Sequence, residues 1–316
     1  MTTGLDTVIG RGVERLAGCL SPDGLWRDFR TAVGESDEWV SGLALAYLAS
    51  VPEAEDLRKG VLPALVRRRR ADGGWGYNAR VASDCDSTCW GVLAGAARLG
   101  ADGAEGSEEG VAAQGGATGD AACALIQAHE TPEGGFSTYR ASLRPRRPEL
   151  RREWFEPQPC VTAAAVLALM SGGLPPTHPA IARALDRLES READGWRSTW
   201  WPGPAYTAHL AREALVRGGR EPRRATAEPP PVDVVFERAH ALLLRLPAAS
   251  PDEVRAAAAW LLDRQQADGS WPSAPILRIP DDTPGVVRLS DDQNRTFATV
   301  AALRALSAVR GRPGAA

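Results

Sequence analysis

The chain alternates between two kinds of helical segment. Amphipathic segments carry apolar residues three or four positions apart, with arginines and other polar residues between them. Their apolar positions are Val13-Leu16-Leu20, Leu62-Leu65-Val66, Ala122-Leu125-Ile126, Ile181-Leu185-Leu188 and Val254-Ala258-Leu261-Leu262. More uniformly apolar segments, with small residues on nearly every face, begin at Ser41, Thr88, Thr162, Thr207 and Thr296. We therefore predict outer helices that face solvent on one side and inner helices that are buried on all sides.

A turn that contains glycine and an aromatic residue follows each amphipathic segment. These turns are residues 22–26, 72–75, 132–136, 194–196 and 268–271. Glycine suits the left-handed conformation just beyond a helix C-terminus, and the next aromatic side chain is expected to pack back over that helix. Recurrence at intervals of roughly 50 to 75 residues indicates an αα repeat array. We predict one all-α domain over residues 1–316, a closed αα toroid of five to six helical hairpins, with 235–246 supplying part of the sixth.

Loop insertions are expected near residues 100–117, 137–159 and 218–232. The first is rich in glycine and alanine, and the third contains three consecutive prolines that no helix interior tolerates. The second insertion carries six arginines, Arg140, Arg144, Arg146, Arg147, Arg151 and Arg152. Such a cluster is either a clamp for phosphate or diphosphate or an ordinary solvated loop.

Composition narrows the class of protein. The chain has 316 residues, 44% of them hydrophobic and 24% charged, which is enough to bury a sizeable core. Its net charge of −3 gives no case for a nucleic-acid partner. The five cysteines form no CxxC pair and lie mostly in apolar contexts, so free thiols and a cytoplasmic protein are expected. Neither a secretion signal nor an apolar run long enough to span a bilayer is visible.

Two carboxylates stand immediately before the inner helix that begins at Thr88. When the inner helices are aligned on their first Ser or Thr, only this repeat has an acid both four and two residues earlier, at Asp84 and Asp86. A helix cap needs only one of them. Two carboxylates that are close together in an apolar cavity cannot both ionise cheaply, so one keeps its proton. In the fifth repeat, Asp292 and Asn294 form a nearly neutral version of the pair.

Residues 261–271 resemble the QW repeat of squalene-hopene cyclases and related class II terpene cyclases, and 127–136 and 70–75 resemble degenerate copies. Asp84-Cys85-Asp86-Ser87-Thr88 is similar to the Asp-x-Asp-Asp-Thr motif of that family, with Ser87 in place of its last acid. The resemblance implies an isoprenoid cyclase of the isomerase or lyase type. In it Asp86, beside Asp84, would protonate an alkene or epoxide of a linear prenyl diphosphate or prenylated precursor, in secondary metabolism.

The resemblance also implies a set of substrate-binding residues, because a carbocation needs π faces and shielding from water. The expected residues are Trp39, Trp90, Thr88, Ser87, Trp201, Tyr206, Asp292 and Asn294. Protonation requires neither a metal nor a cofactor, although a diphosphate substrate would bring Mg²⁺. An isoprenoid is the expected partner, while peripheral contact with a membrane, a homodimer or a partner subunit stays open.

Other functions fit the same pattern. The family's cyclases usually have two helical domains, whereas this chain has room for one toroid, so a non-catalytic toroid that binds a partner or completes a cavity is an alternative. A prenyltransferase-like isoprenoid-binding protein is another, but Asp84 and Cys85 are adjacent, and the four histidines lack metal-ligand spacing. A deep aromatic cavity around Asp86 would favour an enzyme, and a filled interior would favour a scaffold.

Overall fold

Helices make up most of the structure. The computed structural model describes residues 2–95, 121–146, 152–222, 233–280 and 287–312. The helices are α1 (Thr2–Gly18), α2 (Glu38–Leu48), α3 (Glu55–Arg67), α4 (Cys85–Leu93), α6 (Pro159–Ser171), α7 (Pro179–Ser190), α8 (Ala205–Arg217), α9 (Val235–Arg245), α10 (Pro251–Leu262) and α11 (Thr296–Arg310). Residues 121–127 are also helical. Short 3-10 helices span 52–54, 141–146, 152–154 and 192–194.

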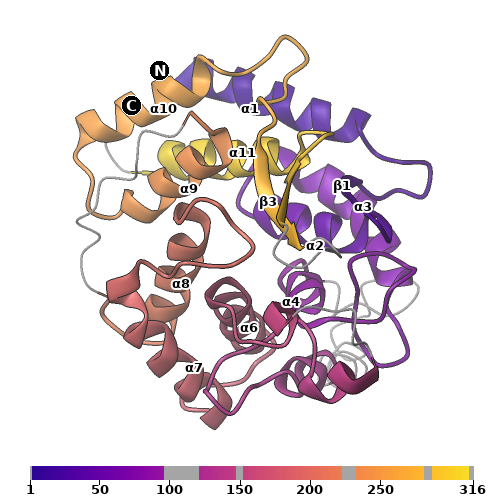
Figure 1. Cartoon of the computed structure of the whole chain (residues 1–316). Coiled ribbons are helices and arrows are strands. Elements are labelled where there is room, and N and C mark those ends of the chain that lie inside the picture. Colours follow the sequence, from indigo (N-terminus) through magenta and orange to yellow (C-terminus); the bar gives the residue numbers. More distant parts are fainter. Residues whose placement is uncertain (1, 96–120, 147–151, 223–232, 281–286, 313–316) are drawn as a thin grey trace, which may run out of the picture.

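Six of the helices in the described ranges form a closed inner ring. Helix α2 contacts α4, and contacts continue from α4 to α6, α8, α9 and α11, which returns to α2. Helices α1, α3, α7 and α10 lie outside this ring (Figure 1). The prediction of a mainly helical chain is confirmed. The predicted insertion at 100–117 and most of that at 218–232 lie outside the described residues, so the number of hairpins stays a prediction.

The difference between inner and outer helices follows from the sequence pattern. In α6 almost every residue from Cys160 to Leu169 is buried, because small and apolar side chains occupy all of its faces. In α7 the buried residues form a single stripe, with polar residues between them. This stripe consists of Ala180, Ile181, Ala184, Leu185 and Leu188. The apolar stripe packs α7 against α6 and α8 and leaves its arginines outside.

The glycine-aromatic turns join each outer helix to the next inner one, as predicted. The turn glycines Gly24, Gly73, Gly134, Gly195 and Gly269 have φ of 80°, 86°, 81°, 66° and 84°, in the left-handed region. Four turn tryptophans donate their indole N–H to a carbonyl in the preceding outer helix, at 2.7–2.8 Å. The pairs are Trp26 with Leu16, Trp75 with Leu65, Trp196 with Leu188, and Trp271 with Leu261. These bonds satisfy helix-end carbonyls that would otherwise be buried without a partner.

A hydroxyl on the inner helix holds the backbone of the same turn. Ser41 accepts from the Trp26 N–H at 3.0 Å, and Thr88 accepts from the Trp75 N–H at 3.2 Å. In the fifth repeat the corresponding residue is Thr299, which accepts from the Trp271 N–H at 3.4 Å. The alignment of that repeat on Thr296 was therefore wrong by about one helical turn. It follows that the acid and amide before α11 do not occupy the positions of Asp84 and Asp86.

Two β-hairpins interrupt the helices, and the sequence pattern did not predict them. Strand β1 (Asp28–Thr31) pairs antiparallel with β2 (Gly34–Ser36), and β3 (Pro275–Pro280) pairs with β4 (Val287–Asp291). The Arg278 N–H in β3 donates to the Trp200 carbonyl at 2.7 Å, while β4 contacts β1. The β3–β4 hairpin thus links the segment before α8 to the segment before α2 (Figure 1). Among the described residues, no helix combines the length and apolarity that a membrane span requires.

Candidate active site

Asp84 caps helix α4. Its Oδ1 accepts from the Ser87 backbone N–H at 2.8 Å, and its Oδ2 accepts from the Ser87 hydroxyl at 2.7 Å. The side chain is buried. Ser87, which replaces the third acid of the motif, therefore holds Asp84 in place. One of the two acids is accounted for by capping, as the sequence indicated.

Asp86 lies in the first turn of α4 and does not cap it. The carboxylate is half-buried, and its Oδ2 accepts from the Trp39 indole N–H at 2.9 Å. Among the described residues, neither a backbone N–H nor an arginine binds this carboxylate. Trp90, one turn later on α4, is buried, and its indole N–H has no hydrogen-bond partner among the described residues. A half-buried carboxylate whose one hydrogen-bond donor among the described residues is an indole N–H indicates a functional role.

Other buried carboxylates near the starts of the ring helices have structural partners. Glu38, at the start of α2, accepts from the Gly76 N–H at 2.9 Å and pairs with Arg70 at 2.6 Å. Glu237, in the first turn of α9, accepts from the Ala205 N–H. Asp292 accepts from the backbone N–H groups of Ala274 and Ala298. Asp28 accepts from those of Phe29, Asn294 and Thr296. Asp86 therefore differs from these acids in its hydrogen bonding as well as in its exposure.

Both acids of the pair have raised pKa values. Burial, together with the charge of Asp84, raises the pKa of Asp86 to about 7, against the hydrogen bond from Trp39, which lowers it. Burial raises the pKa of Asp84 to about 6, against the two hydrogen bonds from Ser87. The charge of Asp84 therefore favours the protonated form of Asp86. Near neutral pH a substantial fraction of Asp86 keeps its proton.

Trp39, the donor to Asp86, belongs to a cluster of aromatic side chains. The Trp39 ring contacts Phe297 at 5.0 Å, Phe29 at 5.7 Å and Trp201 at 6.3 Å between ring centroids. Trp201 in turn contacts Tyr206 at 4.3 Å. Of the predicted substrate-binding aromatic residues, Trp39, Trp201 and Tyr206 lie together in this cluster, whereas Trp90 contacts Tyr47.

The sequence did not identify the phenylalanines of this cluster. Phe236 on α9 contacts Trp201 at 5.3 Å, and Phe297 on α11 contacts Phe29 at 4.8 Å. The position of Phe297 within an apolar inner helix was the available signal. Phe29 gave no such signal, because the strand that contains it was not predicted. Its backbone lies in the left-handed region, with φ 48°, which is uncommon for a residue other than glycine.

Three other predicted substrate-binding residues make hydrogen bonds to the backbone. The Thr88 hydroxyl bonds to Trp75. Asp292 accepts from the Ala298 N–H at 2.8 Å, and the Asn294 amide donates to the Arg27 carbonyl at 2.7 Å. These bonds explain why the residues are present, and a role for them in substrate binding stays a prediction.

A neutral Tyr–His pair lies next to the aromatic cluster. Nδ1 of His240 is 2.7 Å from the Phe236 carbonyl, so it carries the proton and donates. Nε2 must then accept from the Tyr47 hydroxyl, 2.8 Å away. Burial holds the pKa of His240 well below its usual value. Tyr47 also contacts Trp90, with ring centroids 5.8 Å apart, so this pair borders the helix that carries Asp86.

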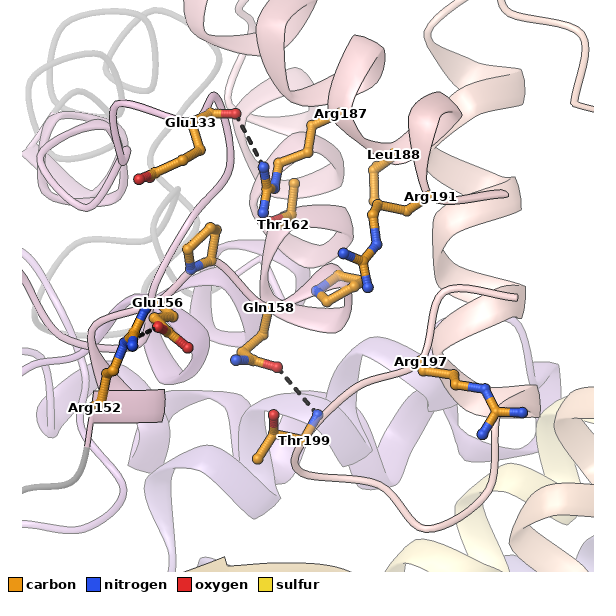
Figure 2. A pocket seen from close by; sticks show the side chains of 12 residues that line it. Glu133, Arg152, Glu156, Gln158, Thr162, Arg187, Leu188, Arg191, Arg197 and Thr199 are labelled. Atoms are coloured by element: carbon orange, nitrogen blue, oxygen red, sulfur yellow. Dashed lines mark hydrogen bonds and ion pairs between the residues drawn. The ribbon is translucent and has the colours of Figure 1, made fainter. Parts of the chain in front are cut away.

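A polar pocket of about 370 Å³ opens elsewhere, beside α6 and α7 (Figure 2). Asp86 does not line it, and the aromatic rings around the acid pack on one another. Of the six loop arginines, Arg152 lines the pocket. Arg147 and Arg151, and the side chains of Arg144 and Arg146, lie outside what the structure describes. In the described ranges, no group of three His, Cys, Asp or Glu side chains is arranged so that it could bind a metal ion.

No protein-family model and no curated protein matches the sequence. Solved structures do match. The type II terpene cyclase MstE from Scytonema is 25% identical, with a TM-score of 0.75, over 98% of this chain and 99% of that one. A variant of it in complex with geranylgeranyl dihydroxybenzoate, its substrate, is 26% identical with a TM-score of 0.75 over 97% of both chains. The ent-copalyl diphosphate synthase from Streptomyces platensis, at 17% identity and a TM-score of 0.53, is matched over 86% of this chain and 50% of that one. The chain therefore has the fold of the type II terpene cyclases along nearly its whole length.

Proposed function

We propose that the protein is a class II terpene cyclase that closes rings in a prenylated precursor after protonation by Asp86. The observation that carries this proposal is the bonding of Asp86, whose carboxylate accepts from an indole N–H and from no backbone donor among the described residues. Structural similarity to a type II terpene cyclase over the full chain supports the reaction class.

The hydrogen bond from Trp39 favours one oxygen of Asp86 as the one that would deliver the proton. Trp39 donates to Oδ2, so the acidic hydrogen of the neutral acid resides on Oδ1. In the first step the Oδ1–H bond breaks and a C–H bond forms at the terminal alkene, or an O–H bond forms at an epoxide. The carboxylate that remains is stabilised by Trp39 and by the N-terminus of α4.

The carbocation that results is attacked by the next double bond of the substrate, which closes a ring and moves the positive charge along the chain. Loss of a proton from the last cation ends the sequence, so a substrate that starts from an alkene is isomerised overall. Trp39, Trp201 and Tyr206 would present π faces to these cations and exclude water. Because their rings contact one another, substrate binding requires them to move apart.

The nature of the substrate is the finer part of the proposal. The MstE variant that matches 97% of this chain binds geranylgeranyl dihydroxybenzoate, an aromatic acid that carries an isoprenoid chain. We therefore place a prenylated aromatic acid first and a free prenyl diphosphate second. The match to MstE over nearly its whole chain also weakens the argument that one toroid is too small for this chemistry.

The test is incubation of the purified protein with geranylgeranyl dihydroxybenzoate, with farnesyl and geranylgeranyl diphosphates, and with non-phosphorylated polyprenyl compounds. The diphosphates are assayed with Mg²⁺ and with a chelator, and products are separated by chromatography coupled to mass spectrometry. We expect cyclic isomers of the prenylated acid. Recovery of every compound unchanged would favour the alternative function, a non-catalytic toroid that binds a partner and whose interior is filled by aromatic side chains.

A further inference from the structure

The polar pocket beside α7 carries unbalanced positive charge. Arg187 on α7, Arg191 at its C-terminus and Arg197 in the following loop line one part of it (Figure 2). Arg152 lines the opposite side but is paired with Glu156. The pocket therefore has four guanidinium groups and, in Glu133 and Glu156, two carboxylates.

Two of these arginines have no carboxylate partner among the described residues. Arg187 donates to the backbone carbonyl of Glu133 at 3.2 Å, and the carboxylate of Glu133 points away from it (Figure 2). Arg197 is exposed and forms no ion pair with the residues that the structure describes. Arg191 lies 3.4 Å from the carboxylate of Asp194, a residue outside the pocket.

The arrangement places like charges together. Burial and the positive charge of Arg191 lower the pKa of Arg187, against the charge of Glu133, which raises it. Gln158 also lines the pocket, and its Oε1 accepts from the Thr199 N–H at 3.1 Å. Its amide NH₂ therefore remains as a donor that has no acceptor among the described residues. An anion in the pocket would satisfy the amide and relieve the repulsion between the arginines.

We propose that this pocket is a binding site for a phosphate-class dianion, separate from the site at Asp86. A single guanidinium fork satisfies a carboxylate, whereas a pocket lined by Arg187, Arg191 and the amide of Gln158 suits a group with more charge and more oxygens. Gln158 and Thr199 are among the residues that line the pocket, and Asp86 is not. The proposal is independent of the cyclase reaction.

The test is calorimetric titration of the full chain with inorganic pyrophosphate and with inorganic phosphate, in chloride buffer of fixed ionic strength. We expect saturable binding to the wild-type protein. Arg191→Gln and Arg187→Gln should each raise the Kd by about tenfold or more, since a hydrogen bond to a charged group contributes about 1.5–3 kcal/mol. Arg191→Lys keeps the charge but loses the fork, so its Kd should lie between those of the wild type and Arg191→Gln.

The matched control is Arg255→Gln, which removes the same charge from the exposed face of α10, where Arg255 pairs with Asp252. Circular dichroism and thermal unfolding verify that each variant is folded. Absence of saturable binding to the wild type, or an equal Kd in Arg191→Gln and Arg255→Gln, would overturn the proposal.

A competition titration identifies the source of the anion. Geranylgeranyl diphosphate is added to protein that is saturated with pyrophosphate, and geranylgeraniol serves as the phosphate-free control. Displacement by the diphosphate alone would show that the pocket takes a prenyl diphosphate by its head group. Simultaneous binding of both would show that it takes a small free phosphate compound.

Discussion

At the scale of single residues, the difference between Asp84 and Asp86 is a difference of hydrogen-bond donors. Ser87 supplies two donors to Asp84 and makes it a cap, whereas one indole N–H reaches Asp86. The sequence identified this pair, because capping needs a single acid and the other had no structural use. It could not identify Trp39 as the donor, since the contact joins the neighbouring helices α2 and α4 through residues that are 47 positions apart in the chain.

The raised pKa of Asp86 predicts how activity depends on pH. The acid must be protonated to act, so kcat/KM should fall as pH rises through about 7, the pKa of Asp86. Trp39 donates to the ionised form and lowers this pKa, so Trp39→Phe should move the falling limb to higher pH. Rate profiles of the two proteins measure the shift.

Trp260→Phe is the control, because Trp260 lies on the outer helix α10 against Arg264. Its profile should coincide with that of the wild type. A falling limb in Trp39→Phe that stays in place, or moves to lower pH, would contradict the role of the indole as a donor to the ionised acid.

At the scale of elements, glycine-aromatic turns and small residues in the inner helices fix how helices pack. The sequence predicted both, because left-handed glycines and all-round apolar faces leave a clear pattern. It did not predict the β-hairpins, whose short strands carry prolines and arginines, nor Thr299 as the anchor of the fifth turn. Those features depend on contacts between segments far apart in the chain.

Gly91 on α4 tests the packing of the turn against the helix that carries the acids. A Cβ at Gly91 would lie 2.4 Å from the Trp75 ring, so Gly91→Ala should lower the free energy of unfolding by ~1–3 kcal/mol or more. Gly60→Ala on α3 is the matched control, because a Cβ there meets nothing within 4 Å. It should stabilise the protein by ~0.5–1 kcal/mol. Urea denaturation measures both, and equal effects would contradict the close packing.

At the scale of the whole molecule, the closed ring buries many carboxylates and should make stability depend on pH. Burial raises the pKa to about 6 for Asp28 and Asp84 and to about 7 for Asp86, Glu237 and Asp292. The folded protein therefore binds more protons than the unfolded chain between roughly pH 4 and 7. Stability should fall as pH rises through this window.

The size of this loss should be on the order of 1 kcal/mol for each buried acid, allowing for relaxation of the buried groups. The free energy of unfolding, measured by urea denaturation across the window, should be lower near neutral pH than at mildly acidic pH. Asp86→Asn should flatten the dependence and stabilise the protein above neutral pH. A free energy of unfolding that rises steadily with pH would contradict the pKa shifts.

The most direct test of the central claim follows the proton itself. The wild-type protein and Asp86→Asn are incubated in deuterated water with the prenylated acid that is turned over, and the product is examined by mass spectrometry and NMR. If Asp86 starts the cyclisation, the wild-type product carries one deuterium at the carbon of the terminal isoprene unit, and Asp86→Asn forms no product. Product from Asp86→Asn with the same label at a comparable rate would contradict Asp86 as the proton donor.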